Sequence, residues 1–183
     1  MRHIISVLVE NEFGVLARVA GLFSGRGFNI ESLCVAETLD PEISSMTIVT
    51  TGSDAILEQI LKQLNKLVNV IKVTDFQDAD YVSREMVLVK VTADEKTREE
   101  ILRMTEIFRG RVVDVSAKSY IVEITGNEEK VKAFLTLVKP LGIKELVRTG
   151  PVAMMRGEKI MRAREKAAPQ RKEETLSDRK AEG

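Results

Sequence analysis

The chain has 183 residues, enough for one domain or two small ones, and 44% of them are hydrophobic, which favours a folded protein over a disordered one. It carries 28 Lys and Arg against 28 Asp and Glu, so its formal net charge is zero. This balance argues against a nucleic-acid partner, because binding a row of phosphates needs an excess of cations. Only 4% of the residues are aromatic, which argues against a surface that stacks bases or sugars.

Cysteine and histidine each occur once, as Cys34 and His3. A disulfide within the chain and a multi-cysteine or histidine-rich metal site are therefore excluded. Cys34 lies in an apolar, strand-like run and is predicted to be a packed thiol, and His3 is predicted to be a strand residue. Residues 1–15 lack a signal-peptide pattern, and no apolar run approaches the ~18 residues of a membrane helix. We therefore expect a cytoplasmic protein with no metal site and no membrane contact.

The first part of the chain alternates strand-like and helix-like segments. β-Branched and apolar runs predict strands over residues 3–9, 28–39, 43–51 and 70–73. Apolar residues at helical spacing predict one helix from Val15 that ends at Gly25 and Gly27. Ser53 and Asp54 supply cap chemistry for a second helix, whose apolar stripe reaches Leu67. The order is β-α-β-β-α-β.

The same order returns after a polar boundary at residues 77–83. Strands are predicted over residues 86–91, 111–115, 119–125 and 143–147, and helices over residues 97–108 and 128–141. The fold class is therefore α+β, with two tandem ferredoxin-like βαββαβ sandwiches over residues 1–77 and 83–162. Helices would cover one face of each small sheet, and we expect a second copy to cover the rest in a dimer. Residues 163–183 are charged, with few large apolar residues, and are predicted to form a flexible tail.

No motif for catalysis is found. Gly21, Gly25 and Gly27 do not complete a G-x-G-x-x-G loop, because Ile30 takes the place of the third glycine. No Ser, Thr or Cys lies in a recognisable nucleophile motif, so a small enzyme has no residue set to support it. RNA-recognition modules share the βαββαβ order but present aromatic rings on two central strands, and residues 4–8 and 45–49 contain none.

The first strand-to-helix loop, residues 11–14, differs from the other loops. Gly14 is predicted at the opening of a helix, where backbone N–H groups lack partners and the helix dipole favours a carboxylate. That interaction is worth about 0.3–1 kcal/mol, and about 2 kcal/mol when partly buried. Asn11 offers a carbonyl to an ammonium group, and Asn29 offers a second polar contact. These groups match the two charged ends of a free amino acid, although a simple turn with a helix cap explains the same residues.

Residues 9–19, Val-Glu-Asn-Glu-Phe-Gly-Val-Leu-Ala-Arg-Val, resemble the opening of an ACT domain. Residues 21–33 are similar to one ACT-containing family, the small regulatory subunits of acetohydroxyacid synthase, also called acetolactate synthase. Residues 84–91, 105–110 and 156–161 agree with the same family. The resemblance covers about residues 1–162, so the first sandwich is expected to be an ACT domain for effector binding and dimerisation.

The resemblance implies a non-catalytic homodimer that binds a large catalytic subunit and raises its activity. The catalytic subunit would hold thiamine diphosphate, Mg²⁺ and FAD, and this chain would hold no cofactor. Feedback inhibition by valine, or another branched-chain amino acid, would act at the interface of two ACT domains. One chain would supply Asn11, Gly14, Val15 and Leu16 to this effector site, and the other chain would supply Asn29 and Ile30. The alternative is a free-standing ACT-type amino-acid sensor that acts on another partner.

Overall fold

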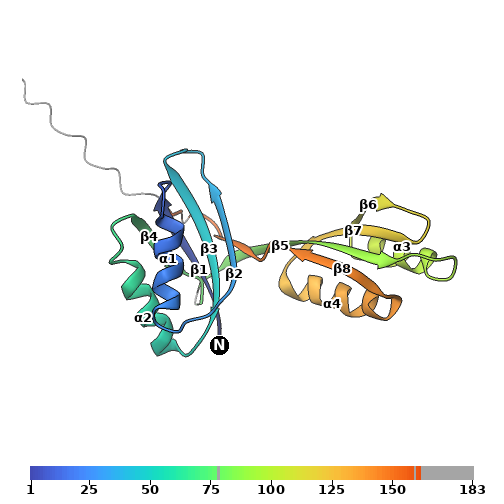
Figure 1. The fold of residues 1–183 in the computed structure, drawn as a ribbon, viewed down its shortest axis with the longest axis horizontal. Coiled ribbons are helices and arrows are strands. Elements are labelled where there is room, and N and C mark those ends of the chain that lie inside the picture. The colour runs from blue at the N-terminus through green and yellow to red at the C-terminus, as the bar shows by residue number, and fades with distance from the viewer. Residues whose placement is uncertain (78, 159, 162–183) are drawn as a thin grey trace, which may run out of the picture.

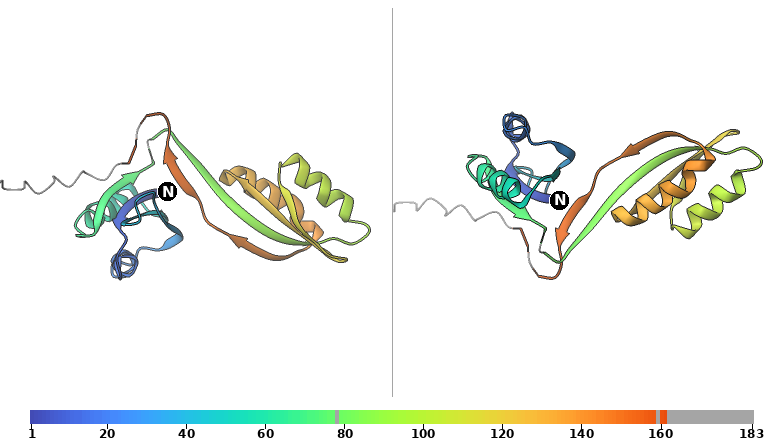
Figure 2. Two further views of the ribbon diagram at one scale, coloured as in Figure 1. Left: turned by 90° about the horizontal axis from the view of Figure 1, so that it is seen from above. Right: turned by 90° about the horizontal axis from the view of Figure 1, so that it is seen from below.

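The computed structural model describes residues 1–77, 79–158 and 160–161, and the predicted tail at residues 163–183 lies outside them. Two lobes are joined by extended chain (Figure 1). Each lobe is a sheet with two helices on one face, and the C-terminal lobe lies on the side of the N-terminal sheet that its helices leave open (Figures 1 and 2).

The N-terminal lobe contains β1 (Arg2–Glu10), α1 (Val15–Ser24), β2 (Ile30–Glu37), β3 (Ile43–Thr51), α2 (Asp54–Leu64) and β4 (Val70–Asp75). Its strands lie in the order β2-β3-β1-β4, and all neighbouring pairs are antiparallel. Side chains alternate between the faces of a strand, so Ile5, Val7 and Val9 of β1 share one face and pack in the buried core with the helices. β2 and β4 are the two edge strands.

The C-terminal lobe repeats this arrangement. It contains β5 (Tyr81–Thr92), α3 (Arg98–Ile107), β6 (Arg111–Val115), β7 (Ser119–Gly126), α4 (Glu128–Val138), the 3₁₀ turn η1 (Lys139–Leu141), β8 (Ile143–Arg148) and β9 (Val152–Met155). The strand order β6-β7-β5-β8 matches that of the first sheet, and Val87, Val89 and Val91 pack in its core. The predicted α+β class with two tandem ferredoxin-like sandwiches is confirmed.

Some helix ends differ from the prediction. Ser53 occupies the cap position of α2, but its side chain makes no capping hydrogen bond. α2 stops at Leu64 rather than Leu67, because the next two N–H groups, of Lys66 and Leu67, donate to carbonyls three residues back instead of four, each at 3.1 Å. α4 ends at Val138 rather than Leu141, because Pro140 has no N–H to continue the α-helical ladder.

The predicted boundary at residues 77–83 overlaps β5, which begins at Tyr81. The first four residues of β5 pair with β9, which was not predicted, and the remaining residues pair with β7 and β8. Between β8 and β9, Gly150 adopts a positive φ of 73°, and a Cβ there would lie 1.8 Å from Oγ of Ser32 in β2. A glycine is therefore needed where this segment passes β2.

Candidate effector-binding site

The Asn11 loop is fastened to the hairpin that joins β2 and β3. The Asn11 backbone N–H donates to the Glu42 carbonyl at 2.7 Å. Its side-chain Nδ2 donates to the Pro41 carbonyl at 2.9 Å and to Oε1 of Glu37 at 3.2 Å. Both amide hydrogens are thus engaged, and Oδ1 of the exposed Asn11 side chain receives no donor from the part of the chain that the structure describes. This oxygen is available to a ligand.

The N-terminus of α1 is uncapped. Gly14 is the cap residue, with φ 81° and ψ −6°, and its carbonyl accepts the first helical hydrogen bond, from Arg18 at 2.9 Å. No side chain caps the helix, and α1 has no acidic residue in its first turn, whereas α2, α3 and α4 each have at least one. Val15 is buried and Leu16 is half-exposed. The helix therefore presents free N–H groups and its positive end to an incoming anion.

A buried asparagine holds the Asn11 loop from its other side. Asn69, in the turn between α2 and β4, is 7% exposed. Its Nδ2 donates to Glu10 at 2.9 Å and to Glu12 at 3.2 Å, and its Oδ1 accepts from Arg18 at 2.5 Å. Its backbone carbonyl accepts from the Glu10 N–H at 2.9 Å. The sequence analysis missed this residue, because its partners are more than fifty positions away and no local motif marks it.

Asn29 and Ile30 lie at the opposite end of the same sheet. Ile30 opposes Thr50, which opposes His3 at the start of β1, and the Asn29 carbonyl accepts from Oγ1 of Thr50 at 2.6 Å. Six residues of β1 separate His3 from the end that carries the Asn11 loop, which amounts to about 20 Å. Within one chain, therefore, the structure brings Asn11, Gly14, Val15 and Leu16 together but leaves Asn29 and Ile30 apart from them.

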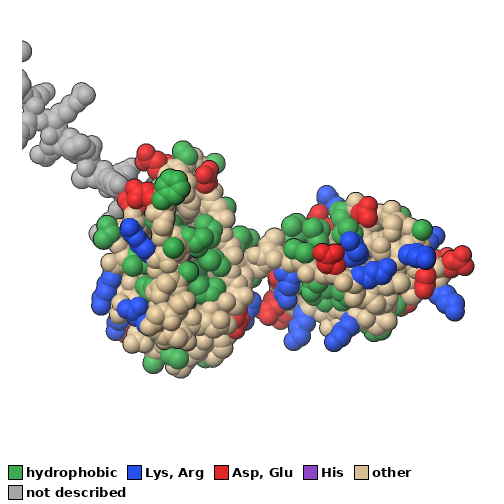
Figure 3. All heavy atoms as spheres, viewed as in Figure 1, with side chains coloured by type: hydrophobic (Ala, Val, Ile, Leu, Met, Phe, Trp, Pro, Cys, Tyr) green, Lys and Arg blue, Asp and Glu red, His purple; other side chains and the backbone are tan. Residues whose placement is uncertain are grey.

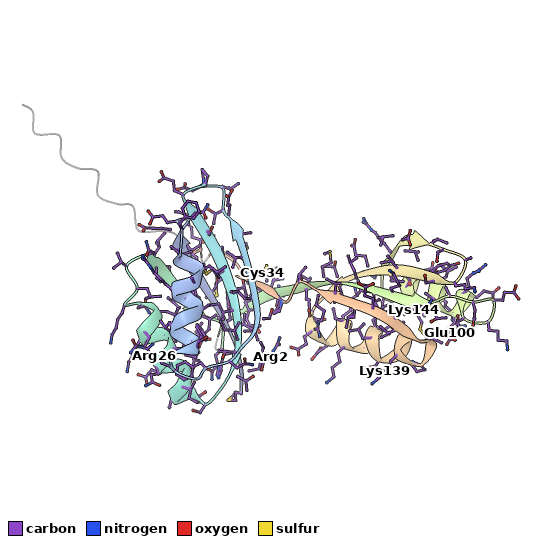
Figure 4. The ribbon with its side chains drawn as sticks, in the orientation of Figure 1. Arg2, Arg26, Cys34, Glu100, Lys139 and Lys144 are labelled. Atoms are coloured by element: carbon purple, nitrogen blue, oxygen red, sulfur yellow. The ribbon has the colours of Figure 1, made fainter. Side chains whose placement is uncertain are left out.

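In the single chain the candidate site is exposed, at Asn11, Gly14 and Leu16. A cavity of 440 Å³ lies elsewhere, between the two lobes, where Arg2, His3, Tyr81 and Glu128 are among its lining residues. Arg2 forms ion pairs with Glu31 of β2 and with Glu128 of α4, so it links the lobes. Figure 4 shows Arg2 on the side of the first sheet that faces away from its helices. Among the described residues, no group of His, Cys, Asp or Glu could hold a metal ion, and no helix is long and apolar enough to cross a membrane.

Comparison with known proteins assigns both lobes. Residues 5–72 match the family described as the AHAS small subunit-like ACT domain, and residues 84–157 match the small subunit of acetolactate synthase. The chain is 58% identical over 160 residues to the probable acetolactate synthase small subunit of Methanothermobacter thermautotrophicus, covering 87% of this chain and 95% of the relative. The chain belongs to the acetolactate synthase small subunit family.

Other members of the acetolactate synthase small subunit family are similar over the same length. The isozyme 3 small subunit of Escherichia coli K12 is 51% identical over 163 residues, which cover 88% of this chain and all of the relative. The crystal structure of the acetolactate synthase small subunit from Thermotoga maritima superposes with a TM-score of 0.79 at 44% identity, covering 87% of this chain and 99% of that one. The N-terminal lobe is thus an ACT domain, as the resemblance predicted, and it supports a regulatory role for the chain.

Proposed function

We propose that this chain is a non-catalytic subunit that binds the large catalytic subunit of acetolactate synthase, raises its activity and confers feedback inhibition by valine or another branched-chain amino acid. Thiamine diphosphate, Mg²⁺ and FAD would reside on the catalytic partner. Membership of the small-subunit family supports the partnership, since relatives such as those of Escherichia coli and Thermotoga maritima are themselves named small subunits of this enzyme.

One observation supports the effector site. Asn29 and Ile30 lie at the start of the edge strand β2, and the loop that carries Asn11 and Gly14 lies at its other end, where Asn11 bonds Glu37. If β2 pairs antiparallel with β2 of a second copy about a twofold axis, the start of each strand lies beside the end of the other. Asn29 and Ile30 of one copy then approach Glu37 of the other. Glu37 is already hydrogen-bonded to Asn11, so a dimer of this kind assembles the six predicted residues into two equivalent sites.

The chemistry of each site suits a branched-chain amino acid. The N–H groups at the start of α1 would bind the carboxylate: those of Gly14 and Leu16, and that of Val15, whose bond to the Glu12 carbonyl is long at 3.4 Å. Oδ1 of Asn11 and the side chain of Asn29 would accept hydrogen bonds from the ammonium group, and Leu16 and Ile30 would contact the aliphatic side chain. A ligand at such an interface alters activity by preferring one arrangement of the two chains over another.

The first experiment measures thermal unfolding of the full chain with valine, leucine or isoleucine, and with lysine as a control. A ligand at 100 times its Kd stabilises the folded state by about 2.7 kcal/mol, which shifts Tm by several degrees at this size. We expect a shift with branched-chain amino acids only. An equal shift with lysine would contradict the site chemistry.

The second experiment adds the chain to its catalytic subunit and measures acetolactate formation. We expect a higher rate and its loss on addition of the effector. A chain that neither binds nor stimulates the catalytic subunit would overturn the regulatory proposal and favour the alternative, a free-standing sensor. The match of residues 84–157 to the small-subunit family favours the regulatory subunit over that alternative.

A further inference from the structure

The most exposed large hydrophobic side chains of the described residues gather at one end of the ACT domain. They are Leu39, Phe13 and Val68, with exposures of 106%, 104% and 92%. Phe13 lies between β1 and α1, Leu39 between β2 and β3, and Val68 between α2 and β4. We call these three residues, together with Glu12, Asp40 and Glu42, the tip surface. Figure 3 shows hydrophobic and acidic side chains together at this end of the N-terminal lobe.

Hydrogen bonds hold the three loops of the tip surface together. Asn11 joins the first loop to the second through its donation to the Pro41 carbonyl. Asn69, next to Val68, joins the third loop to the first through the carboxylates of Glu10 and Glu12. The three apolar side chains therefore project from loops whose relative positions are fixed by these hydrogen bonds. Apolar side chains held together in solvent by a rigid scaffold are typical of protein contact sites.

The charge of the two loops that carry Phe13 and Leu39 has one sign, whereas the loop of Val68 holds Lys66, and Asn69 in it accepts from Arg18. Residues 10–16 and 37–42 contain five carboxylates and no Lys or Arg, the carboxylates being those of Glu10, Glu12, Glu37, Asp40 and Glu42. Tip-to-tip contact between two copies would bring like charges together, and phosphate-rich partners would be repelled. The complementary partner has an apolar recess with Lys and Arg at its rim.

We propose that the tip surface docks on the catalytic subunit of acetolactate synthase, at an apolar recess bordered by basic side chains. The inference rests on the proposed function for the identity of this partner. Asn11 belongs to both the candidate effector site and the scaffold of the tip surface, since it bonds Glu37 and Pro41 of the hairpin that carries Leu39. The effector would bind directly beneath the docking contact, so a shift of one hairpin would carry the inhibitory signal.

The test titrates the catalytic subunit with the full chain and measures the subunit concentration that gives half-maximal activation, without effector. The test variant is the double substitution Leu39→Ser and Val68→Ser. The matched control is Ile107→Ser with Met154→Ser, which changes two exposed hydrophobic residues of the other lobe. Truncating central contact residues weakens association strongly, so we expect the half-maximal concentration to rise at least about ten-fold for the tip variant and to stay unchanged for the control.

A charge variant tests the acidic part of the surface. Asp40→Lys with Glu42→Lys should also raise the half-maximal concentration, and wild-type association should weaken as salt is added. An unchanged titration by the tip variant, or an equal loss in the control, would overturn the docking proposal.

Two further readouts separate the possible failures. Light scattering should give the same mass for the tip variant and the wild type, and loss of the dimer would assign the tip surface to self-association instead. Valine binding by the isolated tip variant should match the wild type. If the wild-type chain itself gives no activation, the proposed function fails, whereas normal activation by the tip variant rejects the docking surface alone.

Discussion

Arg148 of β8 donates two hydrogen bonds to Glu85 of β5, from Nε to Oε1 at 2.6 Å and from Nη2 to Oε2 at 2.7 Å. The Glu85 side chain is 4% exposed, whereas that of Arg148 is 46% exposed. Hydrogen bonding to Glu85 raises the pKa of Arg148 above its ordinary value. The pair stands at the residue where β5 passes from its pairing with β9 to its pairing with β7.

The unequal burial of this pair predicts unequal costs of removing either partner. Arg148→Met leaves a buried carboxylate without its cation, whereas Glu85→Gln leaves a guanidinium that water can reach. We expect the first substitution to lower the free energy of unfolding by about 2 kcal/mol or more, and the second by about 1 kcal/mol. Urea unfolding of both variants measures the difference. Equal losses would show that burial does not govern this pair.

Gly14 is expected to be sensitive to charge rather than to size. A Cβ at this position meets no atom within 4 Å, and the positive φ strains Asp and Asn alike. Gly14→Asp should therefore abolish effector binding through repulsion of the ligand carboxylate, while Gly14→Asn retains weakened binding. Calorimetric titration with valine compares the two. Indistinguishable affinities in two folded variants would remove the carboxylate from the N-terminus of α1.

Asn69 is expected to position the effector loop from a distance. Asn69→Leu removes the donor to Glu10 and Glu12 and the acceptor of Arg18, so the loop that carries Asn11 loosens. We expect valine affinity to fall about five-fold, equivalent to about 1 kcal/mol, with the dimer retained. The control is Asn65→Ala, which removes the neighbouring cap of α2 and should lower stability alone. A purely structural role for Asn69 predicts the same result for both variants.

Cys34 reports on the predicted dimer edge. It is the sole cysteine of the chain and is partly exposed near the middle of β2, so twofold pairing of β2 strands would place the two thiols close together (Figure 4). A short bifunctional maleimide should link two copies in the native protein, and Cys34→Ser should abolish the product. If the native protein has the mass of a dimer but the maleimide does not link its chains, the dimer does not form through β2.

Asp94 makes the start of α3 sensitive to acid. Its carboxylate accepts from the side chain and backbone N–H of Thr97 and from the Lys96 N–H, and these bonds lower its pKa below the ordinary 3.8. The stabilisation is present above the ordinary value and is lost as the pH falls through the lowered one. Asp94→Ala should therefore lower Tm at pH 7, and the difference should shrink as the pH falls below 3.8. A difference independent of pH would indicate that the carboxylate charge is not involved.

Much of the fold follows from local patterns. Apolar residues at a spacing of two or of 3.6 predicted the strands and helices of both sandwiches, because each element has one face that must be buried. β9 escaped this reasoning, because four residues carry little periodicity and their partners at Tyr81–Arg84 are seventy positions away. The end of α4 depended on Pro140, whose effect is local and could have been foreseen.

For the candidate site too, one part could be predicted from local sequence and the rest depends on the three-dimensional fold. The opening of α1 at Gly14 follows from sequence, since a glycine between a strand and an apolar helical stripe indicates an uncapped helix start. The bonds of Asn11 to Pro41 and of Asn69 to Glu10 do not, because they depend on how three separate loops meet in space. The separation of Asn29 from Asn11 required the register of three strands. Whether a second copy reunites them stays a prediction.

β5 is an unbroken strand of twelve residues that hydrogen-bonds to β9 over its first third and to the C-terminal sheet over the rest. Backbone ladders on a single strand resist twisting far better than a loop of glycine and serine would. Gly150, in the segment between β8 and β9, lies close to Ser32 of β2, so this segment contacts the ACT domain beside β5. Any rotation of the ACT domain that this strand transmits would therefore displace the far end of the C-terminal lobe more than its near end.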